Sequence, residues 1–576
     1  MNFQPTDWIV LIVTLAAVIL FGVYKSSTSR NLEGYFLTNR SMPWWAVMLG
    51  VMGTQASAIT FLTAPGQAYT DGMRFVQYYF GLPLAMIILS VTFVPLFHRL
   101  KLFTAYEFLE QRFDVKTRML TSFLFQLSRG LSTGISIFAP SLILHSMLGW
   151  DIYITNLFMG GLLIIYTVSG GAKAVAYTQQ LQFVIIYGAM FMAAWFAIHS
   201  LPEGVGFIDA LQVAGKGGKL NIITSGVDAN GQFDWTDKYN IWSGVIGGLF
   251  LALSYFGTDQ SQVGRYLTAK DISESRRGLL MNGLLKVPLQ FFILLIGCLL
   301  FAYYSYYKAP AFFNQAQEKQ VLQSEYAPQY HKAATEYELV QEKKRSAAIL
   351  LSNAVKRNDE DKINQARVEL QKAETGGKQI REEMKGLIKR ANPGADTNDT
   401  NYIFLRFVGD TLPVGLVGLI IAVIFLAAWG SIAAALNSLA SCTMIDFHKK
   451  ISSKTLTQEE EYKWSKLYTL MWGLLCIVIA QFAYNLGNSL IEAVNILGSW
   501  FYGTILGIFL VAFYQKHSKG QAVFTAAVIT QVIVIVIYFA NIISFLWLNV
   551  IGAVLVVVLS FIIQTLTNQL RLSNKG

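Results

Sequence analysis

Long stretches without a charged side chain recur along the sequence, and they constrain the fold more than any other feature. Residues 8–24 contain no Asp, Glu, Lys or Arg, and the same holds for residues 411–445. An uncharged apolar run of about 18 residues or more is long enough to cross a bilayer as a helix. Because these runs are continuous and do not alternate with polar residues, they favour helices over a membrane β-barrel.

Such segments follow one another from end to end of the chain. Hydrophobic residues make up 54% of the sequence and charged residues only 14%, whereas a soluble domain carries roughly 25% charged residues. We therefore predict an all-α polytopic membrane protein with about thirteen transmembrane helices. The predicted spans lie near residues 7–24, 44–70, 74–97, 119–148, 151–169, 177–199, 241–260, 279–306, 411–445, 465–485, 489–514, 521–540 and 544–566.

Lys and Arg residues concentrate in alternate loops. Arg99 and Lys101 follow the third span, and Lys449 and Lys450 follow the ninth, while the short loops between the basic ones carry few positive charges. Because cytoplasmic loops carry the excess of Lys and Arg, this pattern predicts an N-terminus outside and a C-terminus in the cytoplasm. We expect a multi-pass protein of the cell membrane, plasma or inner. The same bias explains the net charge of +10 without a nucleic-acid partner.

One polar block, residues 308–400, interrupts the spans. Its composition is rich in Ala, Glu, Lys, Gln and Arg, which favours helices. We expect two or three solvated helices outside the membrane, broken at Gly376 and Gly377 and ended at Asn392, Pro393 and Gly394. Solute capture, partner docking and a purely solvated decoration all stay open as its role. The predicted divisions are 1–307 with eight spans, the extracytoplasmic insertion 308–400, and 401–576 with five spans and a short cytoplasmic tail.

The sequence contains no pattern typical of an enzyme. There is no HExxH, no GxSxG and no phosphate-binding loop, and the six histidines are scattered near the ends of spans. A transporter-like sensor would carry a cytoplasmic signalling domain, whereas only a short tail follows residue 566. These observations favour a transporter of a small solute that acts in the bilayer.

Several separated motifs resemble the sodium/solute symporter family. The two most specific are YFGTDQSQVGRYLTAKDISESRRG (255–278) and PVGLVGLIIAVIFLAAWGSIAAALNSLASCTMIDF (413–447). The resemblance implies a LeuT-like fold of two inverted five-helix repeats, 44–199 and 241–514, in which the first helix of each repeat is broken at mid-membrane. Small and polar residues within 50–60 and 244–260 agree with such breaks, because they tolerate an interrupted helix.

The same resemblance implies a sodium site. The family's pattern assigns carbonyl ligands to Gly53, Ala56 and Ala427 and a hydroxyl ligand to Ser431. A second family hydroxyl falls on Gly430, where we expect a water molecule to supply the missing oxygen.

Three further positions depart from the family pattern near this site. The family's aspartate falls on Gln179, and the hydroxyls of an additional sodium site fall on Ala433 and Ala434, so we expect no second sodium. We predict coupling to Na⁺. Coupling to H⁺ stays open, with Asp259 and Glu492 as its protonation sites, although Asp259 would equally cap a broken helix.

Arg129 in the fourth span is the clearest candidate for binding the solute. A charged side chain within a span is costly and is therefore functional by default, and a guanidinium matches a carboxylate in a two-point contact. The alternative is that Arg129 binds no solute and instead extends its charged end toward the membrane surface or pairs with the C-terminus of a helix. The sialic-acid members of the family have an arginine in a similar context, and the resemblance implies pocket residues at Ser57, Thr60 and Gln77, with Gln55 beside them.

The galactose-type members are matched less well. Their gate tyrosine corresponds to Tyr255 and their eighth-span lysine to Lys286, but a glutamine of their site corresponds to Asn495. We count Asp259, Gln179 and Lys286 as candidate coupling or gating residues. The sequence thus predicts an alternating-access symporter that brings a carboxylate-bearing solute, such as a sialic acid or another organic anion, into the cell with Na⁺. A neutral sugar or polyol is the alternative cargo, and we expect a monomer or weak oligomer.

Overall fold

The protein is helical throughout the part of the chain that the computed structural model describes. The described residues are 3–25, 36–228, 230–452, 456–483 and 489–573, and residues 22, 23, 25, 39, 147, 169–174, 176 and 571–573 are described by backbone alone. Its helices include α1 (Pro5–Lys25), α5 (Leu82–Val91), α6 (Phe93–Arg99), α7 (Glu107–Arg112), α9 (Ile152–His199), α10 (Phe207–Lys216), α13 (Ile272–Tyr306), α17 (Ile403–Thr411), α19 (Lys449–Ile451), α20 (Gln458–Gln481), α22 (Gly520–Phe539) and α23 (Phe545–Ser573).

Within the described ranges, nine helical stretches are long and apolar enough to cross a membrane. Shorter apolar helices cover residues 5–21, 152–168 and 243–258. The predicted spans therefore fall on helices, and the total of thirteen crossings stays a prediction. One predicted boundary is wrong: α9 is a single helix that runs through 170–176. Alanines at 172, 174 and 176 favour helix there and override the two glycines before them.

Two helices are broken, as the inverted-repeat fold requires. The first consists of α3 (Trp44–Gln55) and α4 (Ala58–Asp71), separated at Ala56 and Ser57. The second consists of a π-helical turn, η3 (Ser243–Gly247), then α11 (Gly248–Thr258) and α12 (Gln260–Tyr266), separated at Asp259. Both breaks lie inside the sequence windows that predicted them.

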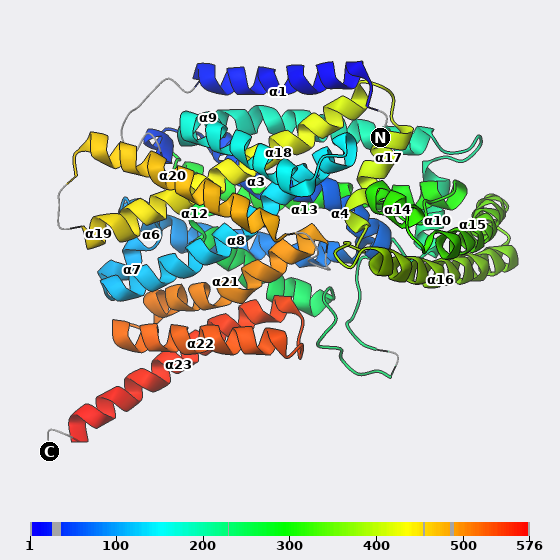
Figure 1. The fold of residues 1–576 in the computed structure, drawn as a ribbon. Coiled ribbons are helices and arrows are strands. Elements are labelled where there is room, and N and C mark those ends of the chain that lie inside the picture. The colour runs from blue at the N-terminus through cyan, green and yellow to red at the C-terminus, as the bar shows by residue number, and fades with distance from the viewer. Residues whose placement is uncertain (1–2, 26–35, 229, 453–455, 484–488, 574–576) are drawn as a thin grey trace.

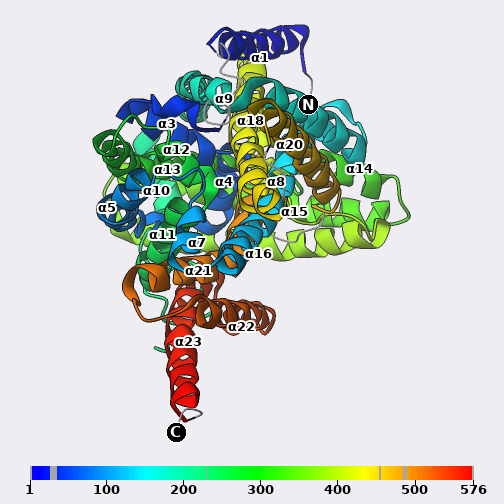
Figure 2. The same ribbon diagram turned by 90° about the vertical axis from the view of Figure 1, so that its left-hand side faces the viewer.

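Three long helices, α8 (Val115–Leu148), α18 (Leu416–Cys442) and α21 (Leu490–Tyr514), pack beside the broken pair. Helix α1 lies along one edge of the bundle, and α22 and α23 lie along the opposite edge (Figure 1, Figure 2). Gly297 shows how closely the helices approach, because a Cβ there would lie 2.1 Å from the carbonyl oxygen of Pro65 in α4. Any side chain at Gly297 would push α13 away from α4.

The polar insertion forms three helices, α14 (Gln315–Leu322), α15 (Ala327–Lys356) and α16 (Glu360–Ala391), beside the bundle (Figure 1). Helices α15 and α16 pair as a hairpin, and α16 ends before Asn392 as predicted. The predicted break at Gly376 and Gly377 is wrong, because α16 continues through both residues. A Cβ at Gly377 would lie 3.6 Å from the Tyr337 ring of α15, an ordinary packing distance, so the helix accommodates this position without strain. The 3₁₀ turns are η1 (Thr38–Arg40), η2 (Gly72–Tyr79) and η4 (Thr400–Tyr402), and η5 (Thr443–His448) is π-helical.

Candidate functional site

The first helix break frees two backbone carbonyls. In a continuous helix the amide of Ser57 would bond the carbonyl of Gly53, and the amide of Thr60 would bond that of Ala56. Here the Ser57 amide bonds the Gln55 carbonyl at 3.1 Å, and the Thr60 amide bonds the Ser57 carbonyl at 3.0 Å. The carbonyls of Gly53 and Ala56 therefore lose their helical partners, and they are the two that the family pattern assigns to sodium.

Helix α18 faces this break with its own oxygens. The Ser431 hydroxyl donates to the carbonyls of Ala427 at 3.0 Å and Ala428 at 3.1 Å, so its lone pairs remain free to accept or to ligate. The Gln179 amide nitrogen of α9 donates to the Gly430 carbonyl at 3.0 Å and reaches the Thr54 hydroxyl at 3.4 Å. Gln179 thus bridges α18 and α3 beside the carbonyls of the break.

The space beside Gly430 is occupied by a side chain. A Cβ on Gly430 would lie 2.6 Å from Oε1 of Gln182. We expected a water molecule beside Gly430, but the side-chain oxygen of Gln182 lies there instead. Sequence reasoning missed Gln182, although its position three residues after Gln179 on one helix was a usable signal, because residues three apart share a face.

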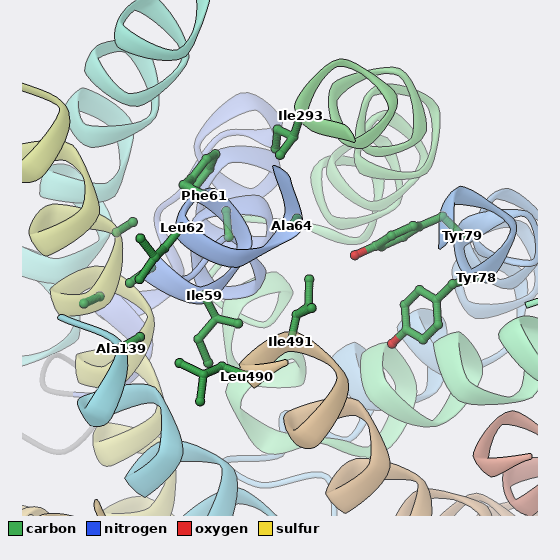
Figure 3. Close-up of a cluster of buried hydrophobic side chains, with 14 of the residues drawn as sticks. Ile59, Phe61, Leu62, Ala64, Tyr78, Tyr79, Ala139, Ile293, Leu490 and Ile491 are labelled. Carbon is green, nitrogen blue, oxygen red and sulfur yellow. The ribbon is translucent and has the colours of Figure 1, made fainter. Parts of the chain in front are cut away.

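A cavity lies between the two breaks, and helices α3, α4, α8, α11, α18 and α21 contribute polar groups to it. Ile59 and Thr60 of α4, Tyr255 of α11 and Asn495 of α21 are among its lining residues. Figure 3 shows Ile59, Leu490 and Ile491 meeting between α4 and α21, with the hydroxyls of Tyr78 and Tyr79 pointing toward the same space. The other lining residues are Thr54, Gln55, Ser57, Arg129, Ser132, Thr133, Ser136, Leu251, Ser431, Ile432, Ala435, Val494 and Tyr502.

Arg129 lies in the wall of this cavity, with 11% of its side chain exposed. Its Nη1 is 3.9 Å from Oδ2 of Asp259, and its guanidinium carbon is 5.8 Å from the centre of the Tyr255 ring. The ion pair is loose, so the guanidinium keeps donors for a second anion. Sequence reasoning missed the hydroxyl residues at positions 132, 133 and 136, which follow Arg129 at helical spacing and line the same cavity.

Asp259 caps the second break. Its Oδ1 accepts bonds from the Ser261 amide at 2.8 Å and the Ser261 hydroxyl at 2.5 Å, and its Oδ2 accepts one from the Tyr502 hydroxyl at 3.2 Å. Both carboxylate oxygens are therefore engaged. Asp259 is the N-cap of α12, which is the second of the two roles that the sequence suggested for it.

Three polar atoms at the cavity have no hydrogen-bond partner among the described residues. They are Nε of Arg129, Oε1 of Gln55 and Nδ2 of Asn495. Asn495 uses its other amide atom to accept from the Tyr78 hydroxyl at 3.2 Å. Because buried polar groups are nearly always bonded, these atoms mark where a polar ligand would bind.

One predicted solute residue, one predicted coupling or gating residue and one predicted protonation site lie apart from the cavity lining. The Gln77 amide donates to the Thr224 hydroxyl at 3.1 Å and the Tyr239 carbonyl at 3.0 Å, so it holds the loop between α10 and η3. The Lys286 ammonium is buried behind the cavity, 5.7 Å from the centre of the Tyr79 ring. Glu492 forms an ion pair with Lys238 of the same loop.

Comparison with known proteins bears on this arrangement. The family description "Sodium:solute symporter family" matches residues 35–327 and 386–530. The chain belongs to the sodium:solute symporter family. As a member, it is a multi-pass membrane transporter that couples solute movement to Na⁺, and it is not an enzyme.

Individual members of the sodium:solute symporter family align over nearly the whole chain. The sodium/sialic acid symporter SiaT of Proteus mirabilis is 26% identical, covering 97% of this chain and 94% of its own. The sodium/sialic acid symporter NanT of Aliivibrio fischeri is 25% identical, covering 97% of this chain and 93% of its own. The solved structure of a Na⁺-coupled sialic acid symporter, substrate-bound and outward-open, superposes with a TM-score of 0.75 at 24% identity and covers 98% of each chain. That likeness establishes the LeuT-like fold.

Proposed function

We propose that this symporter carries a solute with a carboxylate group, a sialic acid or another organic anion, into the cell with Na⁺ by alternating access. The observation that carries the proposal is Arg129. Its guanidinium is buried in a cavity between two broken helices and is only loosely paired with Asp259. A guanidinium in such a site favours a planar anion and binds it in a two-point contact.

The rest of the cavity suits a cargo that also carries hydroxyl or amide groups. The side chain of Gln55 offers an unpartnered amide oxygen, and that of Asn495 offers an unpartnered amide nitrogen. Ser57 and Thr60 add hydroxyls from the first break. Tyr255 accepts a hydrogen bond from Gln262 at 2.7 Å, which holds the ring beside Arg129. A sialic acid, with one carboxylate among hydroxyl and amide groups, matches this set, and the relatives named for that cargo support the choice.

For the ion, we assign Na⁺ to the freed carbonyls of Gly53 and Ala56, the carbonyl of Ala427 and the hydroxyl of Ser431. The amide oxygen of Gln182 occupies the position of the family's second hydroxyl and completes the set. Oxygen donors without a thiolate or imidazole suit a hard cation such as Na⁺. The orientation with the N-terminus outside follows the basic loops, and it places the hairpin α15–α16 outside the cell.

The test is uptake of radiolabelled sialic acid into proteoliposomes that contain the purified protein. We expect uptake to depend on an inward Na⁺ gradient and to be blocked by unlabelled sialic acid. The methyl ester of sialic acid is the matched control, because it keeps every other group and removes only the charge. It should compete at least about a hundredfold less well, since a buried charge pair is worth 2–5 kcal/mol.

Variants of Arg129 separate charge from shape. Arg129→Ala should abolish saturable uptake, and Arg129→Lys should retain a weak remnant because an ammonium lacks the two-point fork. If Arg129→Ala transports normally and a neutral sugar competes in the wild type, the cargo is the neutral polyol, and the carboxylate proposal is wrong.

A further inference from the structure

A second, smaller cavity lies between α12 and α18, on the other side of Thr54 from the solute cavity. Arg265 of α12 and Asn437 of α18 both line it. The other lining residues are the polar Gln260, Ser261, Ser438 and Ser441 and the apolar Phe36, Leu37, Gly264 and Ala434. The Arg265 Nε donates to the Thr54 hydroxyl at 3.1 Å, and Thr54 also lines the solute cavity. A lining residue of the smaller cavity is therefore hydrogen-bonded to a lining residue of the solute cavity.

Arg265 is a buried cation, with 6% of the residue exposed. Its stem passes Gly50, where a Cβ would lie 3.7 Å from the Arg265 Cδ. Across the described ranges no carboxylate lies within ion-pair distance of this guanidinium, and the bond from Nε to Thr54 uses only one of its five N–H groups. A buried guanidinium needs compensation by an anion or by several acceptors.

Asn437 adds an independent sign of a ligand. It is 4% exposed, and neither its amide nitrogen nor its amide oxygen has a hydrogen-bond partner in the part of the chain that is described. The hydroxyls in the same wall are already used, because Ser438 donates to the Ala434 carbonyl at 2.9 Å and Ser441 donates to the Ser438 carbonyl at 2.9 Å. The free donors that converge on the cavity are thus the Arg265 guanidinium and the Asn437 amide.

We propose that this cavity is an anion site in which Arg265 supplies the charge and Asn437 supplies a hydrogen bond. The other polar groups of the wall already have partners, including Gln260 and Ser261. The two unused donors therefore suit a small anion that sheds most of its water. The anion is either a free halide such as chloride, which would travel with or regulate the sodium and the solute, or the carboxylate of the cargo on its way from Arg129 toward the cytoplasmic side. The second source rests on the proposed function, and the first does not.

The experiment measures thermal unfolding of the purified full chain at constant Na⁺ with gluconate as the reference anion. Titrating chloride in place of gluconate should raise the unfolding temperature of the wild type in a saturable way. Asn437→Ala should need about tenfold more chloride for half of the effect, because it loses a hydrogen bond to a charged partner. Ser441→Ala is the matched control, and it should behave as the wild type because its hydroxyl points away to a carbonyl. Arg265→Gln should abolish the response.

A second arm tests the cargo as the source of the anion. In the Arg129→Ala background, where the solute cavity has lost its carboxylate partner, sialic acid should still raise the unfolding temperature, and Asn437→Ala should cancel the rise. A chloride response alone assigns the site to a free halide, and a sialic acid response alone assigns it to the cargo. If neither anion gives a response that depends on Asn437, the cavity holds only water and the proposal is overturned. The chloride arm does not use the cargo, so it stands or fails separately from the transport assignment.

Discussion

The two helix breaks of this symporter are related by the inverted repeat, yet they are completed in opposite ways. At the second break the Asp259 carboxylate bonds the Ser261 amide and the Tyr502 hydroxyl, so the gap is closed from within. At the first break no side chain caps the new helix end at Ser57, and the carbonyls of Gly53 and Ala56 are left without helical partners. The first break can therefore offer oxygens to an ion and a solute, whereas the second break mainly positions Asp259 and Arg129.

The second half of the first broken helix, α4, is instead held from outside the bundle. The Lys219 ammonium donates to the carbonyl of Thr70 at the end of α4, at 2.5 Å. Lys219 also lies 4.0 Å from Glu374 of α16, which pairs with Lys344 of α15 at 2.9 Å. The family match skips residues 328–385, so this support comes from a segment that the family pattern lacks. The far end of α4 is thus tied to the added hairpin, whereas the second break is capped by its own carboxylate.

Removing the internal cap should have the largest effect. Asp259→Ala takes away the N-cap of α12 and leaves Arg129 without its counter-charge, and loss of one partner of a buried pair costs about 3–5 kcal/mol. We expect a large fall in the unfolding temperature of the detergent-solubilised protein and loss of transport.

Asp259→Asn is the informative comparison for this variant. The amide oxygen can still accept from the Ser261 amide, so about 1 kcal/mol of capping should return, while the charge opposite Arg129 stays absent. If Asp259→Ala unfolds at the wild-type temperature, the second break does not depend on its carboxylate, and the contrast between the breaks is wrong.

Loosening the external support should have the next largest effect, and it should depend on pH. Burial opposes ionisation of Glu374, but the charges of Lys344 and Lys219 outweigh it and lower the pKa of its carboxyl from 4.5 to about 2. A carboxyl with a lowered pKa stabilises the fold above its ordinary pKa, and this stability is lost as pH falls from about 4.5 toward 2. The shift corresponds to about 3 kcal/mol at neutral pH.

Glu374→Gln should therefore lower the unfolding temperature at pH 7 and remove most of the difference between pH 7 and pH 3. Glu383→Gln on the same helix is the control, because Glu383 is exposed and such substitutions stay within about 0.5 kcal/mol. Limited proteolysis within 327–391 should rise only in the Glu374 variant. An unchanged pH profile in that variant would show that the hairpin holds α4 by other contacts.

The parts of this contrast that the sequence predicted are those set by local chemistry. The family resemblance implied both breaks, and small and hydroxyl residues inside the apolar spans agreed with them, while an arginine within a span predicted a polar site. The parts it missed depend on contacts between distant segments. Gln77 bonds Thr224 and Tyr239 of the loop between α10 and η3, and Gln182 reaches Gly430 on a helix far along the chain. Helical spacing shows which residues share a face, but it does not show which other helix that face will meet.

A smaller effect is expected at the sodium end of the first break. Ser431→Ala removes one of five proposed oxygens, and we expect the Na⁺ concentration for half-maximal uptake to rise about tenfold, with a maximal rate close to the wild type. Ser141→Ala is the control, because Ser141 is a buried serine of α8 that bonds its own helix at Ile137. Unchanged sodium dependence in Ser431→Ala would move the ion away from the break.

The neighbouring glycine gives a sharper version of this test. Gly430→Ser alone should impair transport, because the new Cβ would lie 2.6 Å from the Gln182 oxygen. The double variant with Gln182→Ala should recover sodium dependence. Truncating Gln182 removes its amide oxygen and frees space beside residue 430, so the new serine hydroxyl can take over as the ligand. Failure of the double variant to improve on either single variant would mean that Gln182 is not a ligand.

The smallest effect should come from Gln55, which lies immediately before the first break. Its Oε1 has no partner among the described residues, and we assign it a single neutral hydrogen bond to the solute, worth about 1 kcal/mol. Gln55→Ala should raise KM for sialic acid several-fold and leave the sodium dependence unchanged. A deoxy analogue that lacks the bonded hydroxyl should bind wild type and Gln55→Ala equally, which a general loss of packing would not produce. If the variant instead shifts only the sodium dependence, the Gln55 side chain belongs to the ion site and not to the solute site.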